Sequence, residues 1–339
     1  MDLNKHKKIV LDTDPGVDDA MALAFLAAHP LADIVAITTV FGNADVEVTT
    51  RNALFLAEKF GVSAPVYMGA RAPLAIQRRV SAFKVHGRDG MGDTGVASHF
   101  AGLAAPGAAH ERLVQLIHAN PNEISILAIG PLTNLALALR HDPSIAPLVR
   151  EVVVMGGAFG WGKRRGNVSP VAEANIANDP HAAEIVFSAS WPVTVVGLDV
   201  TMECILGRAQ AVKLAENAGQ TGKFLWEISR SYEEIYRTHD GFDGCCIHDV
   251  AAAACLMEPG LFEMSYGPIK VVTRDFTIGQ TIQKPDTQAF PPGDWDNLPS
   301  QKVCIEVDHT LLIEMYIQSI VKSNAEVFDI SSVDAKISG

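Results

Sequence analysis

The stretch DTDPGVDD, residues 12–19, places four aspartates within eight positions. An apolar segment, Lys8–Leu11, precedes it, and apolar residues at helical spacing follow it from Asp18 to His29. The chain is therefore expected to leave a buried strand and enter a helix at this loop, and parallel α/β proteins bind ligands at such strand ends. Carboxylates crowded in this way repel one another unless a cation neutralises them or one keeps a proton. The stretch predicts a divalent-metal and substrate site with oxygen ligands.

A simpler interpretation has Asp18 capping the helix while the other aspartates face solvent. That interpretation accounts for one or two aspartates, but not for four in eight residues.

Strand and helix patterns alternate along the rest of the chain, which is typical of βαβ units. The expected further strands are residues 34–40, 66–68, 124–129, 151–155, 192–198, 269–273 and 304–307. The expected further helices are residues 48–60, 110–119, 132–139, 181–188, 208–218, 222–236, 248–257 and 311–321. We expect an α/β fold with an open, mostly parallel sheet flanked by helices, as in a Rossmann fold, and an active site at the carboxyl ends of the strands. No repeat or linker is visible, so residues 1–339 are expected to form a single domain.

Two segments break this alternation. Residues 70–110 are rich in Gly, Ala, Arg and His and show little periodicity, and residues 284–300 form a proline-rich loop. Long loops inside a compact domain are usually functional.

Composition limits the class of protein. The chain has 339 residues, 48% of them hydrophobic, and a formal net charge of −12. It can bury a sizeable core, and its acidity disfavours binding to nucleic acid or to an anionic membrane. The basic clusters at residues 5–8, 78–79 and 163–165 are short and are interpreted as solvated turns.

The cellular compartment follows from two further observations. No apolar run approaches the ~20 residues that span a bilayer, and the charged N-terminus leads directly into a strand without a signal-peptide pattern. Five cysteines without a Cys-x-x-Cys pair fit reduced thiols, and Cys245-Cys246 with His248 lacks the spacing of a zinc module. We expect a cytoplasmic protein.

Other segments offer possible partners for the aspartates. His248-Asp249 opens a helix, where the pair can supply an acid/base group and a metal ligand. Taken alone, the pair is better interpreted as Asp249 capping the helix beside a hydrogen-bonded His248. Residues 129–134 form a strand-to-helix turn with exposed backbone carbonyls, in which Thr133 or Asn134 can cap the helix. Residues 166–179 supply hydrogen-bonding side chains with few charges, which suit the hydroxyls of a sugar or, equally, a polar loop: Asn167, Glu173, Asn175 and Asn178.

Together these segments resemble the inosine-uridine preferring nucleoside hydrolase family, over roughly residues 8–322. The motifs that carry the resemblance are DTDPGVDD at 12–19, VFGN at 40–43, HGRDGMGD at 86–93, AIGPLTNLA at 128–136, VVMGGA at 153–158, GNVSPVAEANIANDP at 166–180 and HDVAAA at 248–253. Their order along the chain leaves little room for coincidence.

The resemblance implies calcium-dependent hydrolysis of the N-glycosidic bond of purine or pyrimidine ribonucleosides, giving ribose and free base. It implies that Ca²⁺ is held by the carboxylates of Asp14, Asp19 and Asp249 and by the backbone carbonyl of Ile129. Asp14 would also be the base that takes a proton from the metal-bound water, and Asp12 would be a buried support.

The resemblance also assigns the substrate contacts. The ribose hydroxyls would be held by Asp18, Asn43, Glu173 and Asn175, with Asn167 near the 5′-hydroxyl and Met155 against the sugar. His86 would lie in a mobile loop over the site, and Tyr232 and Tyr236 would face the base. His248 would lie near the base and help protonate it, since the base leaves poorly as an anion. The family further implies a homodimer or homotetramer.

The sequence departs from the family pattern at three places. Val250 follows His-Asp where proline is frequent, Ala174 stands where some members carry a bulkier residue, and the loop 284–300 is longer and richer in proline. Ala174 and the loop leave the preferred base and the subunit contacts open.

Two other functions fit parts of the sequence. A phosphatase of the haloacid dehalogenase type would use Asp12 and Asp14 as nucleophile and acid, but Gly16 stands where that family has Thr or Val, and no downstream lysine and acidic pair is evident. A nucleoside- or sugar-binding protein without turnover would keep the fold, but the intact acidic set argues against it.

Overall fold

The computed structural model describes residues 6–79 and 83–337. Its strands are β1 (Lys7–Thr13), β2 (Ala32–Thr39), β3 (Val66–Met68), β4 (Ile124–Ala128), β5 (Glu151–Met155), β6 (Val193–Val196), β7 (Ile205–Gly207), β8 (Gly244–Cys246), β9 (Phe262–Gly267), β10 (Ile269–Val271), β11 (Thr281–Gln283) and β12 (Gln301–Val307). Its α-helices are α1 (Val17–Ala28), α2 (Val46–Lys59), α3 (Phe83–His86), α4 (Ala109–Ala119), α5 (Thr133–His141), α6 (Ala174–Asn178), α7 (Pro180–Ser188), α8 (Leu198–Thr201), α9 (Arg208–Asn217), α10 (Gly219–Ile228), α11 (Arg230–His239), α12 (His248–Met257) and α13 (His309–Ile337). Two 3₁₀ helices are η1 (Pro143–Leu148) and η2 (Pro259–Leu261).

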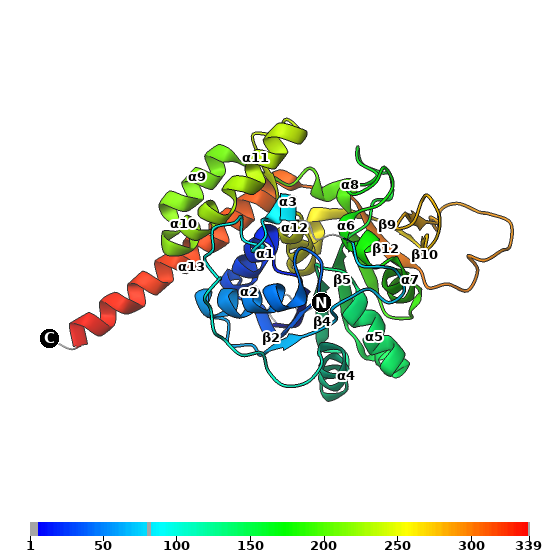
Figure 1. The fold of residues 1–339 in the computed structure, drawn as a ribbon, viewed down its shortest axis with the longest axis horizontal. Helices are drawn as coiled ribbons and strands as arrows, with labels where there is room; N and C mark the ends of the chain where they lie inside the picture. Colours follow the sequence, from blue (N-terminus) through cyan, green and yellow to red (C-terminus); the bar gives the residue numbers. More distant parts are fainter. Residues whose placement is uncertain (1–5, 80–82, 338–339) are drawn as a thin grey trace.

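The main sheet has eight strands in the described part of the chain, in the order β3-β2-β1-β4-β5-β6-β12-β9. Neighbours from β3 to β12 run parallel, and β9 pairs antiparallel with β12 at the edge. Helices flank this sheet (Figure 1). The predicted α/β fold with an open, mostly parallel sheet is confirmed.

Apolar helices cover both faces of the sheet, because successive strand residues point to opposite sides. In β1, Ile9 and Leu11 pack with residues of α1, α2 and α12. Val10, between them, packs on the other face with residues of α4, α5 and α7. In α12 the alanines at 251–254 are buried, and their small side chains let the helix pack between α1 and β5.

The strand order reverses between β1 and β4. From β1 the chain continues to β2 and β3 on one side, whereas β4, β5 and β6 lie on the other. The Ile129 N–H donates a 2.8 Å hydrogen bond to the Asp12 carbonyl, which holds the two strand ends together. Loops leaving such neighbouring strands diverge and open a crevice in which parallel α/β proteins bind ligands. The DTDPGVDD loop lies at this crevice.

The helix predicted over residues 222–236 is wrong as one element, because the chain breaks at Ser229 between α10 and α11. Ser229 Oγ and Arg230 Nε both donate to the Trp226 carbonyl, at 3.0 and 2.8 Å, and so satisfy the end of α10. The break turns α11 toward the carboxyl ends of the strands, where Tyr232 and Tyr236 line a cavity.

The C-terminal third differs most from the prediction. The edge strand β9, with the sequence FEMSYG, was missed because it lacks an apolar run. The strand predicted at 269–273 is β10, which pairs with β11 outside the main sheet. The loop 284–300 has no helix or strand, as predicted, and projects from one side of the molecule, while α13 projects from the other (Figure 1).

Within the described ranges, no helix is long and apolar enough to cross a membrane. The five cysteines are buried and free of disulfide bonds. Cys255 Sγ and Cys304 Sγ lie 3.8 Å apart.

Candidate active site

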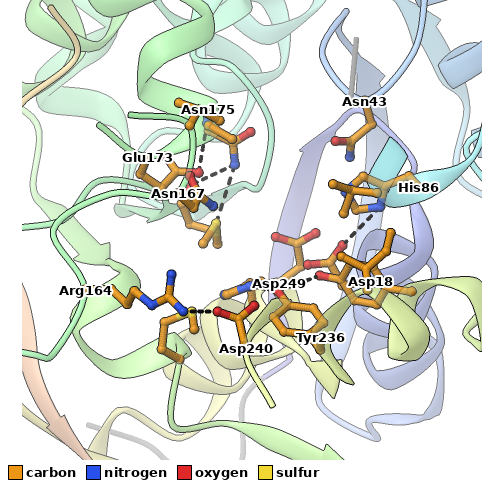
Figure 2. Close-up of a pocket in the computed structure, with 18 of the residues that line it drawn as sticks. Asp18, Asn43, His86, Arg164, Asn167, Glu173, Asn175, Tyr236, Asp240 and Asp249 are labelled. Carbon is orange, nitrogen blue, oxygen red and sulfur yellow. Dashed lines mark hydrogen bonds and ion pairs between the residues drawn. The ribbon is translucent and has the colours of Figure 1, made fainter. Parts of the chain in front are cut away.

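A cavity of about 560 Å³ opens at the carboxyl ends of the central strands. Most of the predicted site residues line it: Asp18, Asn43, His86, Ile129, Met155, Asn167, Glu173, Asn175, Tyr232, Tyr236, His248 and Asp249. Figure 2 shows Asn167, Glu173 and Asn175 on one wall, and Asn43 and His86 on the facing wall. The cavity size falls in the ordinary range of small-ligand pockets, roughly 300–1,000 Å³.

Buried carboxylates form the floor of the cavity. Asp18, Asp19 and Asp249 each offer an oxygen within 4.8 Å of the others, which is the spacing of a possible metal site in the described part of the chain. Asp18 and Asp19 open α1, and Asp249 opens α12, so two helices from distant parts of the sequence bring the carboxylates together. Neither Asp18 nor Asp249 is the N-cap residue of its helix, because Gly16 and Ile247 hold those positions.

Burial and mutual repulsion perturb these acids. Burial, followed by the charge of Asp19, raises the pKa of Asp18 to about 8. The same two causes raise the pKa of Asp14 well above its ordinary value. Burial and then the charges of Asp18, Asp19 and Asp14 raise the pKa of Asp249. A cluster of this kind ionises fully at neutral pH only with a cation beside it.

Asp14 lies beside this cluster and is held on one side only. Its Oδ2 accepts the Asn43 N–H at 2.7 Å, whereas its buried Oδ1 has no hydrogen-bond partner among the described residues. A Cβ at Gly42 would lie 1.9 Å from Oδ2, and a Cβ at Gly130 would lie 2.7 Å from Oδ1. The glycines of the VFGN and AIGP motifs therefore admit the carboxylate, and its free oxygen fits a hard cation.

Asp19 and Ile129 are the other predicted metal ligands. Asp19 accepts hydrogen bonds from Thr13 Oγ1 at 2.5 Å and from the Gly16 N–H at 2.8 Å, which fix the carboxylate at the start of α1. The Ile129 carbonyl accepts Asn175 Nδ2 at 3.1 Å and keeps a second lone pair. These oxygens and those of Asp14 and Asp249 are the donor type that a divalent ion such as Ca²⁺ prefers.

Asp12 is fully buried beneath the loop. Its Oδ2 accepts Thr38 Oγ1 at 2.6 Å and Asn134 Nδ2 at 2.8 Å, and burial raises its pKa to about 7. These contacts support the prediction that Asp12 is a buried residue beneath the aspartate loop rather than a metal ligand. Thr133 or Asn134 was expected to cap α5, but no side chain caps that helix. Asn134 turns instead to Asp12, and Thr133 Oγ1 donates to Asp179 at 2.8 Å.

The wall formed by α6 depends on Glu173. Its carboxylate accepts the N–H groups of Asn175 at 2.8 Å, Gly157 at 3.0 Å and Ile176 at 3.1 Å, so it caps α6 and joins it to the end of β5. Asn175 Nδ2 also donates to the Met155 carbonyl at 3.1 Å. The Asn175 amide is thereby oriented, and Glu173 keeps lone pairs on the cavity side.

His248 is hydrogen-bonded at both ring nitrogens. Nδ1 lies 2.7 Å from Thr201 Oγ1, and Nε2 lies 2.6 Å from the Tyr236 hydroxyl. The Tyr236 hydroxyl in turn lies 3.3 Å from the Tyr232 hydroxyl. Burial lowers the pKa of His248 to about 4, so the ring is uncharged at neutral pH. Thr201 was missed, since nothing in the sequence links it to His248.

His86 closes the cavity from α3, within the segment 70–110. Its Nδ1 accepts the Val17 N–H at 3.3 Å and lies 3.8 Å from Asp18 Oδ1, and its ring stacks on Tyr232 with centroids 5.2 Å apart. Burial lowers the pKa of His86 to about 3, with the charge of His248 as the second cause. Asn52 ties this loop to the aspartate loop, donating to the Asp89 carbonyl at 2.8 Å and to the Pro15 carbonyl at 3.2 Å.

Several residues that line the cavity were not predicted, and two of them form an ion pair. Arg164 was interpreted as part of a solvated turn, but it lines the cavity and forms an ion pair with Asp240 (Figure 2). Its position three residues before Asn167, in the same polar loop, was the available signal.

Comparison with known proteins points to the same family that the sequence motifs resemble. The family model for inosine-uridine preferring nucleoside hydrolase matches residues 9–314. Uridine nucleosidase 1 of Arabidopsis thaliana is 38% identical over 282 residues, which cover 83% of this chain and 82% of the relative.

Solved structures show the same fold. A plant nucleoside hydrolase superposes with a TM-score of 0.89 at 34% identity, over 93% of this chain and 99% of that one. A purine-preferring ribonucleoside hydrolase from Gardnerella vaginalis gives a TM-score of 0.85 at 28% identity, over 94% and 99%. The phosphatase alternative has no support in this match. The chain therefore belongs to the inosine-uridine preferring nucleoside hydrolase family and is an enzyme of the class that hydrolyses N-glycosyl compounds.

Proposed function

We propose that the protein hydrolyses the N-glycosidic bond of ribonucleosides with Ca²⁺ as its cofactor, releasing ribose and a free base. The observation that carries the proposal is the cavity itself. It joins a floor of buried carboxylates, a wall of amide and carboxylate side chains that suit vicinal hydroxyls, and a tyrosine–histidine chain.

The residues that would hold the cation are Asp14, Asp19, Asp249 and the carbonyl of Ile129. The unpartnered Asp14 Oδ1 and the all-oxygen donor set support this assignment. Asp18 also lies in the cluster, with one oxygen near Asp19 and Asp249, and is assigned to the ribose. A bound calcium ion would lower the pKa of a coordinated water and help fix the sugar hydroxyls.

Asp14 is the proposed general base. Its Oδ2 is fixed by the Asn43 N–H, so both roles fall to Oδ1, whose two lone pairs would face the cation and the attacking water. Cleavage of the glycosidic bond places positive charge on the ribosyl ring, and nearby ionised aspartates stabilise that charge.

The amide and carboxylate wall is proposed to hold the ribose. Asn43, Glu173 and Asn175 are fixed by backbone hydrogen bonds, so their remaining polar atoms are oriented before the sugar arrives. Such preorganisation lowers the entropic cost of binding the reactive geometry. Asn167 is assigned to the 5′-hydroxyl, and Met155 to the apolar side of the sugar.

The departing base is proposed to receive a proton through His248 and Tyr236. The uncharged imidazole bonds to hydroxyls on both sides, so it can give a proton at one nitrogen while it takes one at the other. A well-placed general acid contributes ~10²–10⁴-fold to the rate.

The test is ribose release from uridine, cytidine, inosine and adenosine by the purified protein with added calcium. Release of reducing sugar from at least one nucleoside supports the proposal. Equilibrium binding of a nucleoside without any ribose formation would favour the inactive binding protein instead. The cytoplasmic location, the single domain and the homodimer or homotetramer stay predictions, and light scattering would measure the subunit number.

A further inference from the structure

The cavity extends beyond the residues assigned to metal, ribose and proton transfer. Its far end is formed by Arg164, on the loop between β5 and α6, and by Asp240, which follows α11. The two side chains form an ion pair, and Figure 2 shows them beside Tyr236 and well away from Asn43 and His86. The Asp240 side chain is 14% exposed and that of Arg164 44%, so the pair lies at the mouth of the cavity.

The path of the base is set by α11. Tyr232, Tyr236 and Asp240 are four residues apart and all line the cavity, so they follow one face of the helix. With the ribose at the carboxylate floor, a bound base would lie along this face, with its outer edge toward Asp240 and Arg164.

The ion pair leaves hydrogen-bonding capacity for that edge. A guanidinium carries five N–H donors, and the Asp240 contact uses Arg164 Nη2. The contact uses Asp240 Oδ1, so the other carboxylate oxygen is available as an acceptor. Arg164 and Asp240 therefore present a donor and an acceptor side by side.

We propose that Arg164 and Asp240 determine base specificity by reading a ring N–H next to a carbonyl group. Uracil and hypoxanthine carry this arrangement, with the carbonyl accepting from Arg164 and the N–H donating to Asp240. Cytosine and adenine carry an amino group beside an unprotonated ring nitrogen, which offers a less favourable pattern to the same pair. The inference rests on the proposed function and adds which residues choose the base.

The experiment compares kcat/KM for uridine, cytidine, inosine and adenosine, measured as ribose release. The variants are Arg164→Met, which keeps the length of the side chain, Arg164→Lys, which keeps the charge but loses the planar fork, and Asp240→Asn. Arg165→Met is the matched control, because the neighbouring Arg165 does not line the cavity. Circular dichroism and the thermal midpoint establish that each variant is folded.

The wild type is expected to prefer uridine over cytidine and inosine over adenosine. Both ratios should fall about tenfold or more in Arg164→Met and Asp240→Asn, as for loss of a hydrogen bond to a charged group. They should fall in Arg164→Lys as well, and should not change in Arg165→Met.

Three results would overturn the proposal. The wild type could show no base preference, or the kcat/KM ratios could stay unchanged in the folded variants. An equal fall of kcat/KM on all four substrates would show that the pair only closes the mouth of the cavity. In all three the proposed function would stand, provided that ribose is released. No ribose from any nucleoside would instead reject the proposed function itself.

Discussion

The Asn43 N–H donates a 2.7 Å hydrogen bond to Asp14 Oδ2, and this contact joins the loop after β2 to the loop after β1. It fixes one carboxylate oxygen and leaves the other, the buried Oδ1, without a hydrogen-bond partner among residues 6–79 and 83–337. Because the glycines at 42 and 130 make room for this carboxylate, three sequence motifs converge on one side chain.

Asp14→Ala removes both a proposed metal ligand and the proposed base. Turnover should fall by at least ~10²–10⁴, the range for loss of a general base alone. Asp33→Ala is the control, because Asp33 is exposed on β2, outside the lining of the cavity. The measurement is ribose release from uridine under calcium saturation. Turnover by Asp14→Ala at the wild-type rate would show that the base assignment is wrong.

His248→Ala should slow the cleavage of uridine and inosine by ~10²–10⁴-fold, since their bases leave poorly without a proton. A 4-nitrophenyl riboside, whose leaving group is stable as an anion, should lose much less. Tyr236→Phe, which removes the hydroxyl 2.6 Å from His248 Nε2, should show the same contrast to a smaller degree. An equal loss on both kinds of substrate would assign His248 to a structural role.

Because the pKa of the buried Asp12 is raised, we expect the free energy of unfolding of the chelator-treated protein to depend on pH. Burial raises the pKa of Asp12 from 3.8 to about 7 in the folded state, so the folded protein binds the proton more tightly than the unfolded chain. Its contribution to the free energy of unfolding is present below about pH 4 and is lost as the pH rises toward about 7, by an amount on the order of a few kcal/mol.

Asp12→Asn removes this ionisation but keeps an oxygen for Thr38 and Asn134. Relative to the wild type, the variant should therefore become more stable as the pH rises from about 4 to about 8, as measured by urea unfolding. A difference in stability that is the same at both pH values would contradict the buried, protonated Asp12.

Asn52→Ala should detach the loop that holds His86 and Asp89 from the aspartate loop at residues 12–19. The lost hydrogen bonds to the Pro15 and Asp89 carbonyls should lower the free energy of unfolding by about 1–3 kcal/mol. KM for the nucleoside should rise more than kcat falls, because a smaller fraction of molecules holds the loop over the cavity. The control is Asn217→Ala, whose side chain bonds a helix carbonyl at an exposed position. If both variants match the wild type, the loop does not depend on Asn52.

The fold was largely predictable because the sequence patterns of its central strands are strong. β1, β4, β5 and β6 are apolar on both faces, and each is followed by a turn into a helix or a long connection. The edge strand β9 could not be found, because only its two end residues are buried and its sequence has no apolar run. The break at Ser229 depends on side-chain bonds to one helix carbonyl, which no periodicity reveals.

The site was predictable where a motif concentrates unusual chemistry, as in the aspartates of residues 12–19. Asp249 and Ile129 joined them through family resemblance, and the structure brings the Asp249 carboxylate near those of Asp18 and Asp19. Arg164 and Thr201 escaped prediction because each acts through a partner far along the chain, Asp240 in one case and His248 in the other.

We propose above all that this acidic floor binds calcium for the cleavage of ribonucleosides. The most direct measurement is ribose release from uridine by chelator-stripped protein during titration with calcium, with bound metal determined by elemental analysis. We predict negligible release from the stripped protein and full recovery as calcium reaches one ion per chain. Undiminished release by the stripped protein, or recovery with one zinc per chain and none with calcium, would show that calcium is not the metal of this site.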